Sequence, residues 1–364
     1  MLDTIFHCLQ RQLFPILQEE LGELSKLDQQ FCQTISVCDL GRFTRCYEWV
    51  GHGCPPCSRV WLAHAFIAKH VYQFPTTAAL IDALRTRPTL RRLCGWESAG
   101  DIPSEPTFSR AFAAFAQDQL PQQIHEQMVK IHAGPQLVGH VSRDATAVEG
   151  AEKPAVKAKP TAPVVEVPKK RGRPCKGEER PAPPPKRLDL QPTRTLEENL
   201  ADLPKACDIG CKRNSKGHQE CWIGYKLHLD TIDGDIPVSA VLTSASVHDS
   251  QVAIPLAQMT AQRVTSLYDL MDSAYDAPAI HAFSQSLGHV PIIDPNPRRG
   301  EKIELEPARA ERFKERTAAE RVNSLLKERY GGRWVRVRGP AKVMCHLMFG
   351  LVALTAAGLF ARLC

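Results

Sequence analysis

The chain has 364 residues, with 46 lysines and arginines against 40 aspartates and glutamates, and it contains thirteen cysteines. This length is sufficient for two domains with cores of their own, and the net charge of +6 permits a polyanionic partner without requiring one. The first residues lack the basic, apolar and small-residue succession of a secretory signal, which argues against a secreted, disulfide-rich protein. We therefore expect reduced thiols in a cytoplasmic protein.

Residues 1–135 carry apolar side chains at helical spacing, which predicts an all-α N-terminal domain. Within it, Thr76 or the threonine after it can cap one helix, and Ser104 can cap a second. The second helix is basic and bears hydroxyl groups, which suits a helix-turn-helix in which Arg110 contacts DNA. A plain helical bundle has the same spacing, so both interpretations stay open.

Runs of apolar and β-branched residues begin after residue 136 and predict strands. The first three are joined without room for helices, and the later ones alternate with helix-like stretches. The strand-like runs are 137–146, 222–232, 236–246, 266–275 and 289–296, and the helix-like stretches are 250–262, 277–288 and 308–330. This order predicts an α/β domain, formed by residues 136–149 and 206–364, with a mixed sheet flanked by helices.

Residues 345–361 are almost wholly apolar, and their 17 positions are the lower limit for a membrane-spanning helix. Because His346 and Thr355 lie within this segment and nothing else in the chain is membrane-like, we expect a helix buried against the sheet and no membrane partner.

Residues 150–205 are rich in proline, lysine and arginine and nearly free of large apolar side chains. Such a segment cannot bury a core, so we expect a disordered or extended insert that interrupts the α/β domain. Its basic run at 169–174 resembles an AT-hook, in which Arg171 and Arg173 would lie in the narrow minor groove of A·T-rich DNA. A basic solubilising linker explains the same composition.

One charged segment places Phe313, Arg316, Glu320 and Lys327 at steps of three, four and seven. These steps return to one face of an α-helix. A carboxylate flanked by two cations on one stripe suits a metal ion held beside a phosphodiester. A solvated charged helix gives the same pattern, because these residue types are good helix formers.

Two further acids stand near strand ends, Asp144 in the first predicted strand and Asp272 in the fourth. Catalysis of phosphodiester chemistry by two divalent metal ions needs oxygen ligands from separate rigid elements, so Asp144, Asp272 and Glu320 could converge on Mg²⁺. Asp249 is interpreted as a helix cap, and strand alternation puts Asp269 on the face opposite Asp272. The other competing acids are Asp276, Asp294 and Glu315.

Together these motifs resemble the DDE class of bacterial insertion-sequence transposases, in the branch whose signature helix reads Tyr-x2-Arg-x3-Glu-x6-Lys. Phe313 stands where that pattern has tyrosine, so any hydrogen bond of that tyrosine is lost here. The runs WIGYKLHLDT, VLTSASVHDS, MDSAYD and CGWESAGDIPSEPTFSRAF are also similar to this family. The resemblance covers most of the chain outside the insert.

The resemblance implies a ribonuclease-H-like fold in which Asp144, Asp272 and Glu320 bind Mg²⁺ or Mn²⁺. The implied reaction is cleavage at the terminal inverted repeats, followed by strand transfer into target DNA. Two alternatives remain: a non-catalytic DNA-binding protein derived from a transposase, and a metal-dependent nuclease on the same fold.

The family also implies that Arg316 and Lys327 contact DNA phosphate near the cleaved bond, where fixed cations stabilise the transition state. Lys226 could likewise face DNA or the catalytic edge, although an exposed polar strand face is the commoner reason for its alternation with apolar neighbours. The expected assembly is a homodimer on double-stranded DNA, associated with the nucleoid in the cytoplasm.

Four soft ligands, Cys207, Cys211, His218 and Cys221, could form a tetrahedral structural zinc site, although their spacing is not that of a standard finger. Ordinary thiols explain the same cysteines, as they explain the CPPC run at 54–57.

Overall fold

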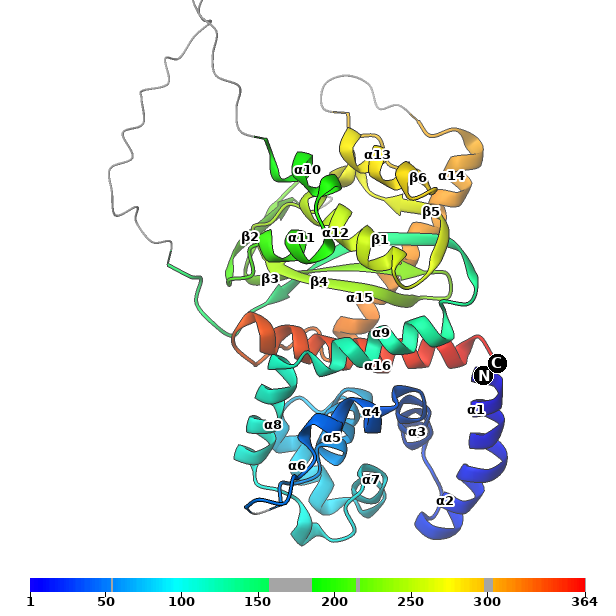
Figure 1. Ribbon diagram of the computed structural model, residues 1–364, viewed down its shortest axis with the longest axis vertical. Coiled ribbons are helices and arrows are strands. Elements are labelled where there is room, and N and C mark those ends of the chain that lie inside the picture. The colour runs from blue at the N-terminus through cyan, green and yellow to red at the C-terminus, as the bar shows by residue number, and fades with distance from the viewer. Residues whose placement is uncertain (54, 157–184, 214–216, 298–303, 364) are drawn as a thin grey trace, which may run out of the picture.

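In the computed structural model, the chain forms a helical half and a half built around a β-sheet, with the long helix α16 (Pro340–Ala361) between them (Figure 1). The two chain ends lie close together at one end of α16. The AT-hook-like run with Arg171 and Arg173, and Cys54 of the CPPC run, lie outside the described residues. The structure describes residues 1–53, 55–156, 185–213, 217–297 and 304–363.

In the described part of the chain, a six-stranded sheet forms the centre of the second half. β3 pairs antiparallel with β1 on one side and with β2 and then β4 on the other, whereas β5 and β6 follow β1 in parallel. This mixed order agrees with the predicted ribonuclease-H-like fold. The strands are β1 (Leu137–Glu149), β2 (Asp208–Arg213), β3 (Gln219–Ile232), β4 (Ile236–Ser244), β5 (Thr265–Met271) and β6 (Val290–Ile293).

Helices cover both faces of the sheet, as the hydrophobic runs predict. β4 is buried along its whole length, because α12 packs on one face and α9 and α16 pack on the other (Figure 1). Its sequence, IPVSAVLTS, has the near-continuous apolar and small residues that burial on both faces requires. The helices on β4 are α16, α9 (Leu120–His132) and α12 (Ser250–Ala261), and α13 (Pro278–Ser286) lies beside β6.

The helical half confirms the all-α prediction. Thr76 caps α6 by accepting a hydrogen bond from the backbone N–H of Ala79 at 3.1 Å, whereas Ser104 stands at the N-cap of α8 without a side-chain capping bond. Besides a π-helical turn (Leu9–Leu13), this half contains α1 (Leu2–Cys8), α2 (Phe14–Leu21), α3 (Lys26–Cys38), α4 (Leu40–Thr44), α5 (Arg59–Val71), α6 (Thr77–Thr86), α7 (Pro88–Cys94) and α8 (Glu105–Gln117).

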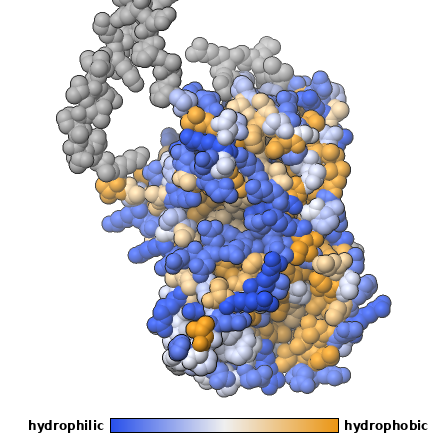
Figure 2. Space-filling model, in the orientation of Figure 1, coloured by the Kyte–Doolittle hydropathy of each residue, from blue (hydrophilic) through white to orange (hydrophobic). Residues whose placement is uncertain are grey.

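Among the described residues, α16 alone is long and apolar enough to cross a membrane, but most of it is buried inside the protein. Its Phe349 ring lies 5.7 Å from that of Phe66 and 6.4 Å from that of Phe112, so one apolar core continues from the helical half onto the sheet. The prediction of a buried helix is confirmed. Apolar residues also gather on the surface of the helical half (Figure 2), where Leu13 and Ile16 are exposed.

Residues 187–202 correct the predicted extent of the insert. They fold into α10 (Arg187–Leu190) and α11 (Leu196–Asp202), which pack against α12. The buried Asn199 amide donates to Gln191 O and to Gln258 Oε1, both at 3.0 Å. The prediction of an extended segment is wrong here, because Leu188 and Leu200 pack into apolar clusters with the sheet half and the polar side chains add hydrogen bonds.

The predicted helix 308–330 is interrupted. α14 (Pro307–Phe313) leads into a 3₁₀ turn (Lys314–Arg316), and α15 (Thr317–Arg329) follows. The hydroxyl of Ser142 on β1 donates to the carbonyl of Glu315 at 3.1 Å, which fixes this turn against the sheet. Arg316 therefore precedes the α-helix that carries Glu320, and the prediction of a single helix is wrong at this turn.

Candidate active site

β1 and β5 bring two of the predicted acids to the same level of the sheet. The strands are parallel neighbours, and Arg143 pairs in register with Met271. The next residues along each, Asp144 and Asp272, therefore lie side by side. Asp144 lies within β1, whereas Asp272 directly follows β5 and accepts a hydrogen bond from the backbone N–H of Ala274 at 3.0 Å.

The side chains of Asp144 and Asp272 are half-buried, and nearby cations only partly balance their negative charge. Burial raises the pKa of Asp144 to about 6, and the charge of Asp272 adds to this, whereas Arg316 opposes it. Burial also raises the pKa of Asp272, with a further contribution from Asp249 and an opposing one from Arg316. Carboxylates held together in this way favour a bound proton or a bound cation.

Arg316 is a common neighbour of the three predicted acids. Its guanidinium donates a hydrogen bond to Glu320, and its charge lowers the pKa values of Asp144 and Asp272. The Glu320 side chain is 53% exposed. The structure thus brings Asp144 and Asp272 together and links Glu320 to them through a guanidinium.

Asn323 is a site residue that the sequence did not single out. Its side-chain amide donates to Oδ2 of Asp144 at 3.0 Å, and it is buried. It lies three positions after Glu320 on α15, on the same helix face. That spacing was the available signal: a polar residue on the stripe of Glu320 and Lys327 is in place to contact a strand acid.

Two family models match the chain. One, described as a transposase DDE domain, matches residues 202–356, and the other, described as a transposase domain, matches residues 19–114. Together they cover more than half of the chain. The chain belongs to the DDE transposases of insertion sequences. The DDE match contains Asp272 and Glu320 and begins after Asp144. No curated protein and no solved structure matches the chain.

Lys226 of the transposase lies beside an acid that interacts with Asp272. Its ammonium group donates to Asp249 and to the carbonyl of Val247, both at 2.9 Å, and its side chain is only 15% exposed. Asp249 stands at the N-cap of α12 but makes no side-chain capping bond. Lys226 therefore pairs with an acid that raises the pKa of Asp272, which fits the predicted position at the catalytic edge, and a DNA contact by Lys226 stays a prediction.

Lys327 and Arg110 lie in different parts of the transposase. Burial lowers the pKa of Lys327, and the charge of Lys212 adds to this while that of Asp144 opposes it. Lys327 is therefore within electrostatic reach of the acid cluster. Arg110 is exposed on α8 in the helical half, where it donates to the hydroxyl of Thr107 at 3.2 Å.

The acids partly fit a metal site. Among the described residues, no group of three or more His, Cys, Asp or Glu side chains is arranged to hold a metal ion. The carboxylate of Glu320 is bound by Arg316. Asp144 and Asp272 do suit a hard divalent cation, because they are oxygen ligands on rigid elements. Their raised pKa values show that neighbouring cations do not fully balance their negative charge.

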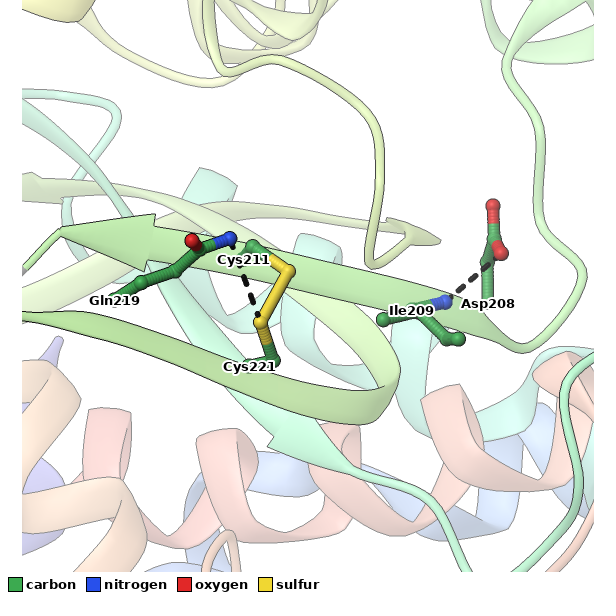
Figure 3. The surroundings of a disulfide bond; sticks show 5 residues. All are labelled: Asp208, Ile209, Cys211, Gln219 and Cys221. Atoms are coloured by element: carbon green, nitrogen blue, oxygen red, sulfur yellow. Dashed lines mark hydrogen bonds between the residues drawn. A yellow bond between two sulfur atoms is a disulfide. The ribbon is translucent and has the colours of Figure 1, made fainter.

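The proposed zinc ligands of the transposase do not assemble. Cys211 and Cys221 stand opposite each other on β2 and β3 and form a disulfide (Figure 3). Cys207 is buried, with its sulfur 3.7 Å from the carbonyl oxygen of Glu152. Because the disulfide removes two of the four ligands, the zinc interpretation that included His218 is wrong. The expectation of reduced thiols is also wrong for this pair.

Proposed function

We propose that Asp144, Asp272 and Glu320 are the catalytic acids of this transposase. The enzyme would cleave DNA at the ends of its element and join the freed 3′-hydroxyl to target DNA. The observation that carries the proposal is the parallel register of β1 and β5, which sets Asp144 level with Asp272. The interaction of Arg316 with all three acids supports their grouping.

Asp144 and Asp272 would hold Mg²⁺ or Mn²⁺, and Glu320 would complete the set of ligands. A divalent cation bound there supplies charge stabilisation for the phosphoryl oxygens and activates the attacking oxygen. Because Glu320 is mostly exposed, its carboxylate has room to exchange Arg316 for a cation. Asn323 holds the Asp144 carboxylate in one orientation through its amide.

Arg316 would then act on the DNA. Its guanidinium, once released by Glu320, can donate charge-assisted hydrogen bonds to a phosphate beside the acids. Lys327 supplies a second cation at the same site, since its pKa responds to the charge of Asp144. Lys226 contributes indirectly, by neutralising Asp249.

The two halves would divide DNA binding from cleavage. Residues 1–135 would bind the terminal inverted repeats, with Arg110 among the contacts. The catalytic domain would comprise 136–149 and 206–364, and we add 187–202 to it because α10 and α11 pack on α12. The active form would be a homodimer that bridges two ends of double-stranded DNA at the nucleoid, in the cytoplasm.

The test uses purified protein, Mg²⁺ and a duplex that carries the terminal repeats. Joined products are expected from the wild type, and Asp144→Asn, Asp272→Asn and Glu320→Gln should each lower cleavage by about a thousandfold or more while binding persists. Glu328→Gln is the matched control, since Glu328 is an exposed acid on the same helix.

The products distinguish the remaining possibilities. Cleavage without joining would replace transposition by a nuclease activity, and a shifted complex without cleavage would leave a DNA-binding protein. Full cleavage by any one acid variant would remove that residue from the proposed triad.

A further inference from the structure

A cavity of about 420 Å³ lies where the helical half meets the chain entering α16. Aromatic side chains from α5 and α8 form part of its wall. Its polar lining is mostly cationic: Lys69 from α5, Arg336 and Arg338 from the segment before α16, and Lys342 from the first turn of α16. The hydroxyls of Thr77 and Ser109 also line it.

Acidic side chains balance little of the positive charge in this cavity. Glu105 is the one acid lining the described cavity, and it is exposed. Lys69 is only 9% exposed, and within the described part of the chain Lys69, Arg336 and Lys342 form no ion pair. Burial lowers the pKa of Lys69 to about 8, and the charge of Arg336 adds to this. Such a cluster is unfavourable alone and would be stabilised by an anion.

The segment that carries Arg336 is held firmly in place. The ring N–H of His70 donates to the carbonyl of Tyr330 at 2.9 Å, and that of His346 donates to the carbonyl of Gly331 at 2.9 Å. Both histidines are buried. These bonds join α5 and α16 to the start of the segment, and Val335, the neighbour of Arg336, is buried.

The segment also connects the cavity with the acid cluster. Lys327 interacts electrostatically with both Asp144 and Arg333, and Arg336 interacts with Lys69. Arg333 and the cavity-lining Arg336 both belong to the segment before α16.

We propose that this cavity binds a phosphodiester group of DNA, outside the cleavage centre, through Lys69 and Arg336. The proposal rests on DNA as the partner of the transposase but not on the identity of the catalytic acids. The phosphate would occupy the junction between the helical half and α16, so the same duplex would contact both halves of the chain.

The first test measures the affinity of the full chain for duplex DNA across a range of salt concentrations, without divalent cations. Arg336→Gln should weaken binding about tenfold and reduce the slope of log K against log salt by about 1, as expected for one lost phosphate contact. Arg11→Gln is the charge-matched control, because Arg11 is exposed in the turn between α1 and α2, which lie on the opposite side of the helical half from α8 (Figure 1). Equal slopes for both variants would overturn the proposal.

The second test uses Lys69→Met, which keeps the aliphatic part of the side chain and removes the charge. The variant should have a higher Tm than the wild type and about tenfold weaker DNA binding, a combination that a purely structural lysine would not give. A lower Tm with unchanged DNA affinity would contradict the proposal.

Inorganic phosphate separates the two sources of the anion. At matched ionic strength, phosphate should raise the Tm of the wild type more than that of Arg336→Gln, and duplex DNA should compete with it. Phosphate stabilisation that DNA does not diminish would assign the cavity to a free anion and overturn the DNA contact. Because these readouts involve no cleavage, their failure is distinct from failure of the catalytic triad.

Discussion

The acid cluster around Asp144 and the cavity around Lys69 both hold like charges together, but they are compensated to different degrees. Arg316 and the amide of Asn323 oppose the repulsion at Asp144. Lys69 is buried beside Arg336 without an ion pair among the described residues. This difference agrees with the two proposals, a small cation bound by the acids and a larger anion bound in the cavity.

The two sites also have opposite pH dependence. A raised carboxyl pKa means that ionisation of Asp144 destabilises the fold, whereas a lowered ammonium pKa means that protonation of Lys69 does so. Stability should therefore decrease as Asp144 ionises and increase as Lys69 loses its proton. The following variants test this comparison.

Arg316→Gln should affect all three acids at once, because it removes the cation that they share. We expect DNA cleavage to fall about 100- to 1,000-fold, since a fixed cation would no longer stabilise the transferring phosphoryl group. The pKa values of Asp144 and Asp272 should rise further, because Arg316 lowers both. Cleavage rates and NMR titration of the carboxyl groups measure the two effects. Unchanged carboxyl pKa values would mean that the acid cluster is not compensated by Arg316.

Asp144→Asn should stabilise the fold at neutral pH while abolishing cleavage. The folded-state pKa of about 6 lies above the unfolded value of about 4, so the ionised group destabilises the protein fully above pH 6 and not below pH 4. The gain in free energy of unfolding is at most about 3 kcal/mol. Denaturation at pH 7.5 and pH 4 checks this, and an equal gain at both pH values would contradict it.

Lys69→Met should show the reverse dependence. The lysine is destabilising in its charged form, so the stability of the wild type should rise as the pH increases from about 8 to about 10.5. The variant should exceed the wild type by at most about 3 kcal/mol below pH 8 and lose this advantage above pH 10.5. Thermal unfolding over this range is the measurement. An advantage that persists at pH 11 would arise from packing and not from charge.

Asn323→Leu should have the smallest effect in this series. It removes the hydrogen bond to Asp144 and fills a similar volume, so we expect a loss of about 1 kcal/mol and a further rise in the pKa of Asp144. Chemical denaturation and the pH profile of cleavage measure these changes. Asn323→Gln is the comparison variant, because it keeps the amide group but moves it by one methylene. It therefore tests whether the hydrogen bond to Asp144 depends on the position of the amide. No shift in the pH profile would show that Asn323 does not hold Asp144.

A strand with a long apolar run can be predicted from the sequence, whereas a short strand with polar residues cannot. β4 has a continuous buried run and is predicted as a strand, whereas β2 is short and polar, and its Cys211 is predicted only as a possible zinc ligand. The disulfide could not be predicted because it depends on the register that sets Cys211 opposite Cys221. α11 was missed for a related reason, since it is short and its contacts, the packing of Leu200 and the hydrogen bonds of Asn199, join segments distant in the chain.

The amino-acid sequence by itself determined the α/β class, the helical N-terminal region, the buried C-terminal helix and the family to which the chain belongs. These follow from local periodicity and from motifs, which are properties of neighbouring residues. The tertiary structure alone decided that Asp144 lies level with Asp272, that Lys226 pairs with Asp249, and that Lys69 meets Arg336. Each of these contacts joins residues distant in the chain, and strand register and helix packing, which no local pattern encodes, set their separation and their charge environment.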